Sequence, residues 1–542
     1  MRAKWWGGVL VSSAATAFAL GCLGEDVAPG DPSITGDAGG SDGSPGGDGG
    51  TSESDAGAAD AALSTFTLDP ARPRIARGAK GSAKLTVTRL GTPTEIPVSL
   101  TGLPAGVTAT TPTIGASTDS TTIGFDVKED AGVGFFPFSV GAASASSLAA
   151  TLVVPGAPSG FDTSFDQDGI LLEAGTGNYN AVLVLPDGGV VAAGASAVGG
   201  GTWVVRRYGA DGVADATWNA KTVGKLPTTN APRAIARDAA SGKLYVVGSS
   251  TGNAELLTIV RLNPDGSVDE SWAGGGTYRA TTVETPQGSR GNAAVVLPDG
   301  KLVVAGQRSP VGLVARYTTD GQADGTFAQF TTSGNGELFG IALLPSSGSL
   351  GGGRVLATGT DSSGSPPAQL AARLTVDGSP DTVFGPGGVR TYASGCRGVG
   401  FAMTSDGDAV LVGNDVTAPA LCTTRIAASA GGNLGWTQKT SAGSSGSFTT
   451  AAPVWNGTGS YSGGEAGGSQ DRFALLERRL ANGDPDATFG EGGTLRIEDP
   501  AVPDVYRYVI RASATATDGR LVLVGSRSSG GTTTGFVMRI WQ

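Results

Sequence analysis

Histidine is absent from this chain of 542 residues, and cysteine occurs only three times. Without imidazole the chain cannot build a Ser-His-Asp or Cys-His nucleophile, and it lacks the usual ligand of zinc, copper and non-haem iron sites. Charged residues make up 16% of the sequence, against roughly 25% in an average soluble protein. We therefore expect no metal and no cofactor.

Basic residues are also missing from one whole segment. Residues 23–62 contain nine acidic residues and no lysine or arginine. Removing these nine acids and the two basic residues of 1–22 from the total charge of −11 leaves −4 for the rest of the chain. A nearly neutral body offers no field that would hold a phosphate backbone, so we expect no nucleic-acid binding.

Glycine is present in excess, with 90 residues, while apolar residues still make up 39% of the chain. That apolar share is enough to form a core, which argues against disorder of the whole chain. Segment 23–62 is different because it consists mainly of Gly, Asp, Ser, Ala and Pro. We expect it to be a disordered acidic tether.

The first 22 residues have the pattern of an export signal. Arg2 and Lys4 precede an apolar stretch, 5–20, which is shorter than the roughly 20 residues of a transmembrane helix. The run A-L-G-C at 19–22 resembles the processing box of bacterial lipoproteins. The resemblance implies cleavage before Cys22, lipidation of that cysteine and anchoring in the outer membrane. An ordinary cleaved signal is the alternative.

Residues 63–156 contain short stretches, at 84–88, 123–127 and 136–140, that alternate apolar with polar or small residues. This is the period of half-buried strands, and no helical stretch separates them, so we predict a β-sandwich. The segment 100–107 resembles a turn of bacterial immunoglobulin-like extracellular domains. That resemblance implies an immunoglobulin-like spacer.

The remaining chain, 160–542, repeats three landmarks seven times. A D-x-x-aromatic motif, with Asn433 in place of Asp in one copy, recurs every 52 to 57 residues and ends at Phe165, Trp218, Trp272, Phe327, Phe384, Trp436 and Phe489. Each repeat has one arginine in an apolar stretch: Arg207, Arg261, Arg316, Arg373, Arg425, Arg479 and Arg539. Another apolar stretch ends in glycine: Gly194, Gly248, Gly306, Gly359, Gly413, Gly463 or Gly464, and Gly525.

Each repeat is predicted to form four short strands, which in the first repeat lie near 170–173, 181–185, 190–195 and 203–208. An Asp-Gly pair between the second and third strands, as at 187–188, favours a tight hairpin. Four antiparallel strands repeated seven times predict a seven-bladed β-propeller. We therefore expect an all-β protein, in which an immunoglobulin-like β-sandwich precedes the propeller.

These repeats resemble the delta-60 repeat family, whose copies combine a D-x-x-F-G-x-x-G start with a hairpin that contains Asp-Gly. The closest copies are 381–388 and 486–493, and departures occur at Asn433 and in 454–457. The resemblance implies a repeat architecture and carries no implication of enzymatic activity.

The repeated side chains each allow two interpretations. The aspartates could form a calcium-binding ring or cap their own turns, and we expect caps. The loop at 263–269 lacks the spaced acids of a calcium-binding EF-hand. The arginines could line an anion channel or pair with the aspartates, and we expect the pairs. The aromatic residues are expected to lie in the cores of the blades.

Two long-range links complete the predicted fold. We expect 162–173 to pair as an outer strand beside the last strand of the chain, because no later motif supplies that strand. With Cys22 lipidated, Cys396 and Cys422 remain in the fifth repeat of an exported chain, so we expect a disulfide between them. A loop end would have to fold back to bring these cysteines together.

The expected function is that of a monomeric, lipid-anchored and non-enzymatic protein of the cell envelope. Its propeller would present a binding or scaffold surface to a protein or glycan partner. The alternative is a propeller hydrolase or lyase that acts without histidine on an extracellular polymer, through Asp, Glu, Tyr or Lys. No repeat carries an insertion with clustered acids, which favours the first hypothesis.

Overall fold

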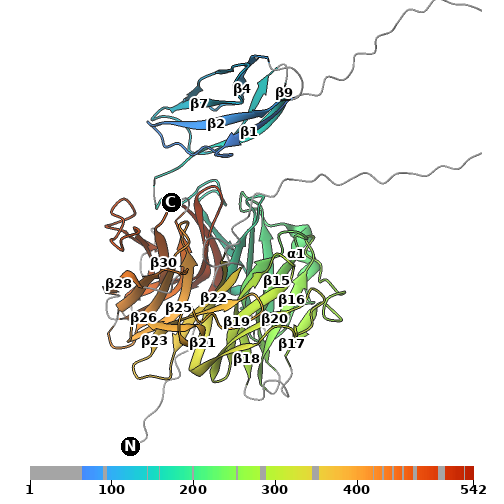
Figure 1. Cartoon of the computed structure of the whole chain (residues 1–542), viewed down its shortest axis with the longest axis vertical. Coiled ribbons are helices and arrows are strands. Elements are labelled where there is room, and N and C mark those ends of the chain that lie inside the picture. Colours follow the sequence, from blue (N-terminus) through green and yellow to red (C-terminus); the bar gives the residue numbers. More distant parts are fainter. Residues whose placement is uncertain are drawn as a thin grey trace, which may run out of the picture. The chain divides into compact units, whose positions relative to one another are not determined.

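The computed structural model describes residues 64–542 apart from 90–93, 143–144, 158, 198–200, 252–253, 281–287, 345–352, 419, 430–432, 442–444, 455–456, 468–472, 498–506 and 530. These residues fall into two compact units, one that ends at Val154 and one from Pro155 to Gln542 (Figure 1). The predicted signal, the tether and Cys22 lie outside the described residues.

The smaller unit is all-β. Its described strands are β1 (Thr65–Asp69), β2 (Lys80–Thr88), β3 (Ile96–Pro97), β4 (Ser99–Thr101), β5 (Val107–Ala109), β6 (Thr113–Ile114), β7 (Ser120–Val127), β8 (Gly134–Ala142) and β9 (Ala145–Val154). β1-β2-β7-β5 form one sheet, β4-β8-β9 form a second, and β3 pairs with β6. Leu85, Ile123 and Val140 are fully buried in one core that both larger sheets share.

The first half of the larger unit contains short antiparallel strands and one helix. They are β10 (Ile170–Glu173), β11 (Thr176–Val184), β12 (Val190–Ser196), β13 (Trp203–Tyr208), α1 (Ala216–Thr222), β14 (Pro232–Arg237), β15 (Leu244–Thr251), β16 (Glu255–Leu262), β17 (Thr277–Arg279), β18 (Ser289–Val296), β19 (Leu302–Arg308), β20 (Val311–Tyr317) and β21 (Phe330–Leu344).

The second half continues the same pattern of strands. They are β22 (Arg354–Asp361), β23 (Ala368–Thr375), β24 (Val389–Tyr392), β25 (Cys396–Met403), β26 (Ala409–Asp415), β27 (Ala420–Ile426), β28 (Asn433–Ser441), β29 (Ser445–Pro453), β30 (Ser460–Gly467), β31 (Phe473–Arg479), β32 (Thr494–Ile497), β33 (Arg507–Thr515), β34 (Arg520–Ser529) and β35 (Thr532–Trp541). A 3-10 turn, Pro386–Gly388, precedes β24.

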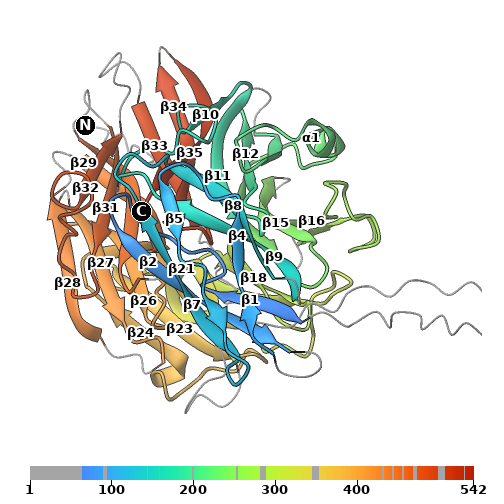
Figure 2. The same ribbon diagram turned by 90° about the horizontal axis from the view of Figure 1, so that it is seen from above.

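The sheets of the larger unit follow one another around a common centre in the order of the sequence (Figure 2). β14–β17, β25–β28 and β29–β32 each form a four-stranded sheet. β11–β13 form a sheet of three strands, and β18–β24 form one continuous sheet of seven. The all-β prediction is confirmed. The prediction of four strands in every repeat is confirmed in the first repeat, as β10–β13, but it is wrong in the second, where α1 replaces the first strand, and in the fourth, where the first two strands are the single strand β21.

Glycines after the D-x-x-aromatic motif explain both departures. In four copies Gly169, Gly276, Gly388 and Gly493 adopt positive φ and turn the chain into an outer strand. The copy that contains Trp218 has Thr222 at the equivalent position, and helix α1 takes the place of the outer strand. The copy that contains Phe327 lacks glycine as well, and β21 begins three residues later, so that it pairs first with β20 and then with β22.

The first and last strands of the larger unit pair with each other. β10 lies antiparallel to β35, with Ile170 opposite Met538, and the sheet order is β10-β35-β34-β33. The predicted pairing of 162–173 with the last strand is therefore confirmed. Each repeat that has an outer strand accordingly contributes this first strand to the preceding sheet and its other strands to its own sheet.

A β-bulge at one position in the innermost strand of every repeat was not predicted. One unpaired residue interrupts the register of each of these innermost strands: Asn180, Arg233, Asn292, Phe339, Val399, Thr449 and Arg511. The repeated glycine of the next strand stands beside this bulge. A Cβ at Gly306 would be 2.0 Å from the carbonyl oxygen of Arg290, and Gly464, rather than Gly463, has the equivalent 1.9 Å approach to Ser447. The bulge therefore requires the glycine that marks each repeat.

Candidate functional site

Each D-x-x-aromatic turn is a polar junction, and the copy at Asp324 shows its complete form. One oxygen of Asp324 accepts hydrogen bonds from the backbone N–H (2.9 Å) and the hydroxyl (2.6 Å) of Thr326. The other oxygen forms ion pairs with Arg316 Nε at 2.8 Å and Lys301 Nζ at 3.1 Å. The guanidinium carbon of Arg316 lies 4.9 Å from the centroid of the Phe327 ring. One carboxylate thus caps the turn and balances two cations.

The same junction recurs in three more copies. The aspartate pairs with the repeat arginine in Arg539–Asp162 (2.7 Å), Arg261–Asp269 (2.7 Å) and Arg373–Asp381 (3.0 Å). A second cation, Arg520, Lys243 or Arg354, reaches the same aspartate from the start of a neighbouring strand. The rings of Phe165, Trp272 and Phe384 are buried below the guanidinium groups. The aspartate caps and the arginine pairs that the sequence suggests are both present in these copies.

Arg479 was assigned incorrectly from the sequence. Arg478, not Arg479, pairs with Asp486, with Nε 3.0 Å from the carboxylate. Arg479 instead pairs with Glu477 at 2.7 Å. The spacing along the sequence explains the error. The arginine precedes its aspartate by eight residues in Arg261–Asp269 and in Arg316–Asp324. Only Arg478 satisfies this spacing, while Phe489 occupies its expected place in the core.

The copy that contains Trp218 is more open than the others. Arg207 pairs with Asp187 of the Asp-Gly hairpin at 2.8 Å and with Asp215 at 3.5 Å. Its side chain remains 28% exposed, against 7% for Arg316. Trp218, on helix α1, is buried and donates a hydrogen bond to the carbonyl oxygen of Pro264 at 3.0 Å. The helix therefore keeps the aromatic residue in the core although the outer strand is missing.

The copy with Asn433 has a different junction. Arg425, which precedes Asn433 by eight residues, pairs with Asp406 and with Asp408 (2.8 Å), both from the β25–β26 hairpin. Asp408 occupies the hairpin position of Lys301, since the backbone N–H of the residue four before it donates to its carbonyl in both hairpins. The side chains of Asn433 and Trp436 lie outside the described part of the chain. Here the acid comes from the hairpin instead of the turn.

The cations keep these carboxylates ionised. Burial alone would raise the pKa of Asp269, but hydrogen bonds with Lys243 and Ser271 and the charge of Arg261 lower that pKa to about 2. The pKa values of four further aspartates are lowered by similar hydrogen bonds and cations, against burial: Asp162, Asp324, Asp381 and Asp486. A carboxylate that is held ionised at neutral pH is a poor general acid.

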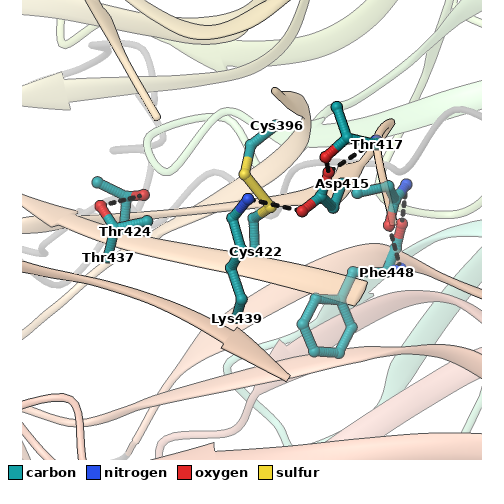
Figure 3. The surroundings of a disulfide bond; sticks show 9 residues. Cys396, Asp415, Thr417, Cys422, Thr424, Thr437, Lys439 and Phe448 are labelled. Atoms are coloured by element: carbon teal, nitrogen blue, oxygen red, sulfur yellow. Dashed lines mark hydrogen bonds and ion pairs between the residues drawn. A yellow bond between two sulfur atoms is a disulfide. The ribbon is translucent and has the colours of Figure 1, made fainter. Parts of the chain in front are cut away.

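The two cysteines of the fifth repeat form a disulfide across one sheet (Figure 3). Cys396 begins β25 and Cys422 lies in β27, and their Cα atoms are 6.1 Å apart. Both strands pair with β26, so no loop end has to fold back as the sequence interpretation required. The ion pair between Lys439 and Asp415, at 2.6 Å, lies beside the bond.

Two tyrosines and a glutamate link β10 to β11 and β13 of the first repeat. Tyr179 and Tyr208 share a hydrogen bond of 2.7 Å, and the Tyr208 hydroxyl donates to Glu173 of β10 at 3.0 Å. Both tyrosines are fully buried, and burial raises the pKa of each above its ordinary value. Because they are closed to solvent and held neutral, these groups are suited to fixing β10 rather than to attacking a substrate.

A second polar cluster lies where the innermost strands begin. Arg290 of β18 binds both oxygens of Glu337 on β21, at 2.6 and 3.0 Å, and also reaches Glu255 of β16 at 3.2 Å. Asn292, the bulged residue of β18, donates to Glu337 at 2.9 Å. Gln307 accepts from Arg290 at 2.8 Å. These side chains come from three sequence repeats, and the sequence interpretation had singled out none of them.

This cluster borders a cavity of about 300 Å³. Its polar lining includes Arg290, Gln307, Glu337, Thr360, Ser362 and Arg397, and Phe339 contributes an apolar wall. The volume lies at the lower end of the range of small-molecule sites, which is roughly 300–1,000 Å³. Bulges beside such positions aim side chains differently from a regular strand. The cavity is therefore the candidate binding site.

Two negative findings apply to the described residues alone. Within them, no three His, Cys, Asp or Glu side chains gather closely enough to ligate a metal ion. The same part of the chain contains no helix with the length and apolar character needed to cross a membrane.

Comparison with known proteins agrees with this fold. Residues 239–271 and 297–327 match a family described as a domain of unknown function (DUF5122) beta-propeller. These matches, with the sheets arranged around a centre, identify the larger unit as a β-propeller. A search of curated proteins finds no match to this chain.

Several solved structures are similar in outline to the chain. A Hadza microbial sialidase, Hz136, is 9% identical, with 88% of this chain and 99% of that chain covered and a TM-score of 0.35. The periplasmic gluconolactonase PpgL of Pseudomonas aeruginosa is 14% identical, with 65% and 96% covered and a TM-score of 0.35. A putative 6-phosphogluconolactonase of Bacteroides uniformis is 11% identical, with 62% and 92% covered and a TM-score of 0.34. At these scores the resemblance carries no argument about activity.

Proposed function

We propose that this chain is a lipid-anchored, non-enzymatic protein of the cell envelope, whose propeller binds a glycan or protein partner and serves as a scaffold. The observation that carries the proposal is the use of the repeated carboxylates. Asp162, Asp269, Asp324 and Asp381 each face two cations, and their lowered pKa values suit structural ion pairs rather than proton transfer.

We further propose a closed ring of seven blades of the delta-60 type. The support is that the innermost strands β11, β14, β18, β21, β25, β29 and β33 contact one another in this order, and that β33 also contacts β11. Each of them carries the same bulge. The seven-stranded sheet then counts as two blades that share β21. The smaller unit, with two sheets around one core, is proposed as an immunoglobulin-like spacer.

The proposed location rests on the sequence of 1–62 alone. Lipidation of Cys22 would anchor the chain in the outer membrane, and the acidic segment 23–62 would separate the folded units from the lipid surface. Expression of the full chain and of Cys22→Ser in a Gram-negative host tests this. We expect the unaltered chain in the outer-membrane fraction with a lipid-modified N-terminal peptide, and the variant in the soluble periplasmic fraction. Equal distribution of the two would contradict the anchor.

The binding function is tested with soluble 64–542, which contains both units. A glycan array and a panel of envelope polysaccharides should give saturable binding, while the same ligands remain chemically unchanged after prolonged incubation. Turnover that disappears when one carboxylate such as Glu337 is replaced by Gln would support a hydrolase or lyase instead. A folded protein that binds no member of either panel and no envelope protein would contradict the scaffold proposal.

A further inference from the structure

Arg397 of β25 lacks the acidic partner that Arg290, the equivalent residue of β18, has in Glu337. Arg290 and Arg397 are each the second residue of an innermost strand, and their carbonyl oxygens make the same close approach to the repeat glycines Gly306 and Gly413. Arg290 is paired with Glu337, whose carbonyl has the equivalent place opposite Gly359 in the next innermost strand. For Arg397, the residue at that place in the next innermost strand, β29, is not an acid but Ser447.

The guanidinium of Arg397 is therefore left without a counter-ion. Its Nε is buried and has no hydrogen-bond partner, and within the described residues none of its nitrogens forms an ion pair. A cation that is partly removed from water without a partner is unfavourable, whereas a carboxylate can bind a guanidinium through two parallel hydrogen bonds. The arrangement lacks only an anion.

The surroundings of Arg397 indicate what kind of anion fits. Arg397 lines the cavity of about 300 Å³, in which the carboxylate of Glu337 is already bound by Arg290 and Asn292. Asn335 and Ser362 line its exposed edge and offer an amide and a hydroxyl. Phe339 adds an apolar wall. A ligand with one carboxylate, several hydroxyl groups and one apolar face matches this lining.

We propose that the cavity beside the start of β18 and of β25 and the middle of β21 binds an acidic sugar, with Arg397 holding the sugar carboxylate. This inference rests on the proposed glycan-binding function and specifies its ligand class. Arg397 supplies the charge, the cavity rim forms hydrogen bonds with hydroxyl groups, and the Arg290–Glu337 pair keeps the floor rigid. A neutral sugar of the same size lacks the group that the site is built to hold.

The test uses soluble 64–542 and titration calorimetry, with D-glucuronate as the probe, D-glucose as its neutral counterpart and sulfate as a simple anion. We expect glucuronate to bind at least tenfold more tightly than either control. Arg397→Gln should weaken glucuronate binding at least tenfold, and Arg397→Lys should recover part of it because the charge returns without the bidentate geometry. Arg279→Gln, at an exposed residue of β17, is the matched control and should change nothing.

Several outcomes would overturn the proposal. These are equal glucuronate binding by Arg397→Gln with an unchanged thermal midpoint, sulfate binding as tight as glucuronate, and failure of folded unaltered protein to bind glucuronate. A further result separates this inference from the function on which it rests. If the unaltered protein and Arg397→Gln bind the same polymer on the array equally well, the cavity proposal fails while glycan binding stands.

Discussion

The junction at Asp324 and the junction that carries Asn433 solve one electrostatic problem in opposite ways. At the first, the turn supplies the acid and the hairpin supplies a cation, Lys301. At the second, the turn residue is neutral and the equivalent hairpin position supplies an acid, Asp408. In both junctions, the repeat arginine has an acidic side chain within ion-pair distance.

The comparison teaches that the repeats preserve charge balance rather than individual residues. An asparagine in the turn together with a lysine in the hairpin would place a second cation beside the repeat arginine and remove the acid that one of these two positions supplies. The exchange at Asn433 avoids this state by changing both positions. The repeat with the exchange is also the repeat that contains the Cys396–Cys422 disulfide.

The largest effect on stability is expected when the pH is lowered, because acid protonates the carboxylates of both kinds of junction. The pKa of Asp269 is about 2 in the folded protein, against roughly 3.9 for an ordinary aspartate, and the pKa of Asp406 beside Arg425 is also lowered. A lowered folded-state pKa gives stability that is complete above about pH 4 and is lost as the pH falls towards 2. The urea midpoint of 64–542 should therefore be nearly constant from pH 7 to 5 and fall steeply below 4. A midpoint that is unchanged at pH 3 would contradict this.

Asp324→Asn should reproduce at one junction the state that the exchange avoids. Arg316 would lose its acid and Lys301 would keep only the longer pair with Asp299, at 3.8 Å. Removing one partner of a buried ion pair costs about 3 kcal/mol or more of unfolding free energy. Urea denaturation followed by circular dichroism measures the loss. Asp320→Asn, in the exposed turn nearby, is the control and should cost less than about 1 kcal/mol. Equal losses would show that the junction has no special role.

Reducing the Cys396–Cys422 disulfide should lower the free energy of unfolding by a similar or slightly smaller amount. A link across 26 residues is worth about 3 kcal/mol through the entropy of the unfolded chain. The denaturation midpoint should fall on adding reductant, whereas the Cys396→Ser, Cys422→Ser double variant should not respond. Mass spectrometry of unreduced protein should find no free thiol at either residue. Two free thiols would remove the bond from the structure of the native protein.

The sharpest test of the comparison is a charge exchange back to the common pattern. Asp408→Lys alone should cost about 2 kcal/mol because Arg425 loses an acid at 2.8 Å and gains a neighbouring cation. Adding Asn433→Asp should restore at least about 1 kcal/mol, since the turn then supplies the acid as it does at Asp324. A double-mutant cycle in urea measures this coupling. Additive losses would indicate that the two positions act independently.

Much of the fold could be predicted because short sequence patterns that repeat along the chain indicate it. The Asp-Gly hairpins and the D-x-x-aromatic turns each depend on residues within a single repeat. The pairing of 162–173 with the last strand spans the chain, but it followed from the count of repeated motifs. The bulges could not be predicted from any single strand, because the extra residue follows no fixed side-chain pattern. The invariant glycine opposite each bulge was visible, but only the close carbonyl approach explains it.

The candidate site was missed for a different reason. Arg290, Glu337 and Arg397 share one register position in three innermost strands, but the surrounding sequence does not set them apart from other charged residues. Their meeting depends on how successive sheets are placed around the centre, which is a tertiary property. The prediction of Arg479 was wrong by one residue, and the eight-residue spacing between the arginine and its aspartate identifies Arg478 instead.

The pairing of β10 with β35 also determines when the larger unit can fold. Arg539 reaches the hydroxyl of Ser164 across 375 positions of sequence, and contacts of such separation form slowly because a long loop must close first. During synthesis, every sheet before the last can assemble while β10 still lacks its partner strand. Until residues 532–541 arrive, β10 presents an unpaired edge to which a strand of another chain could add. The pairing that gives β10 its partner in the finished protein thus leaves the growing chain dependent on protection until the final strand is in place.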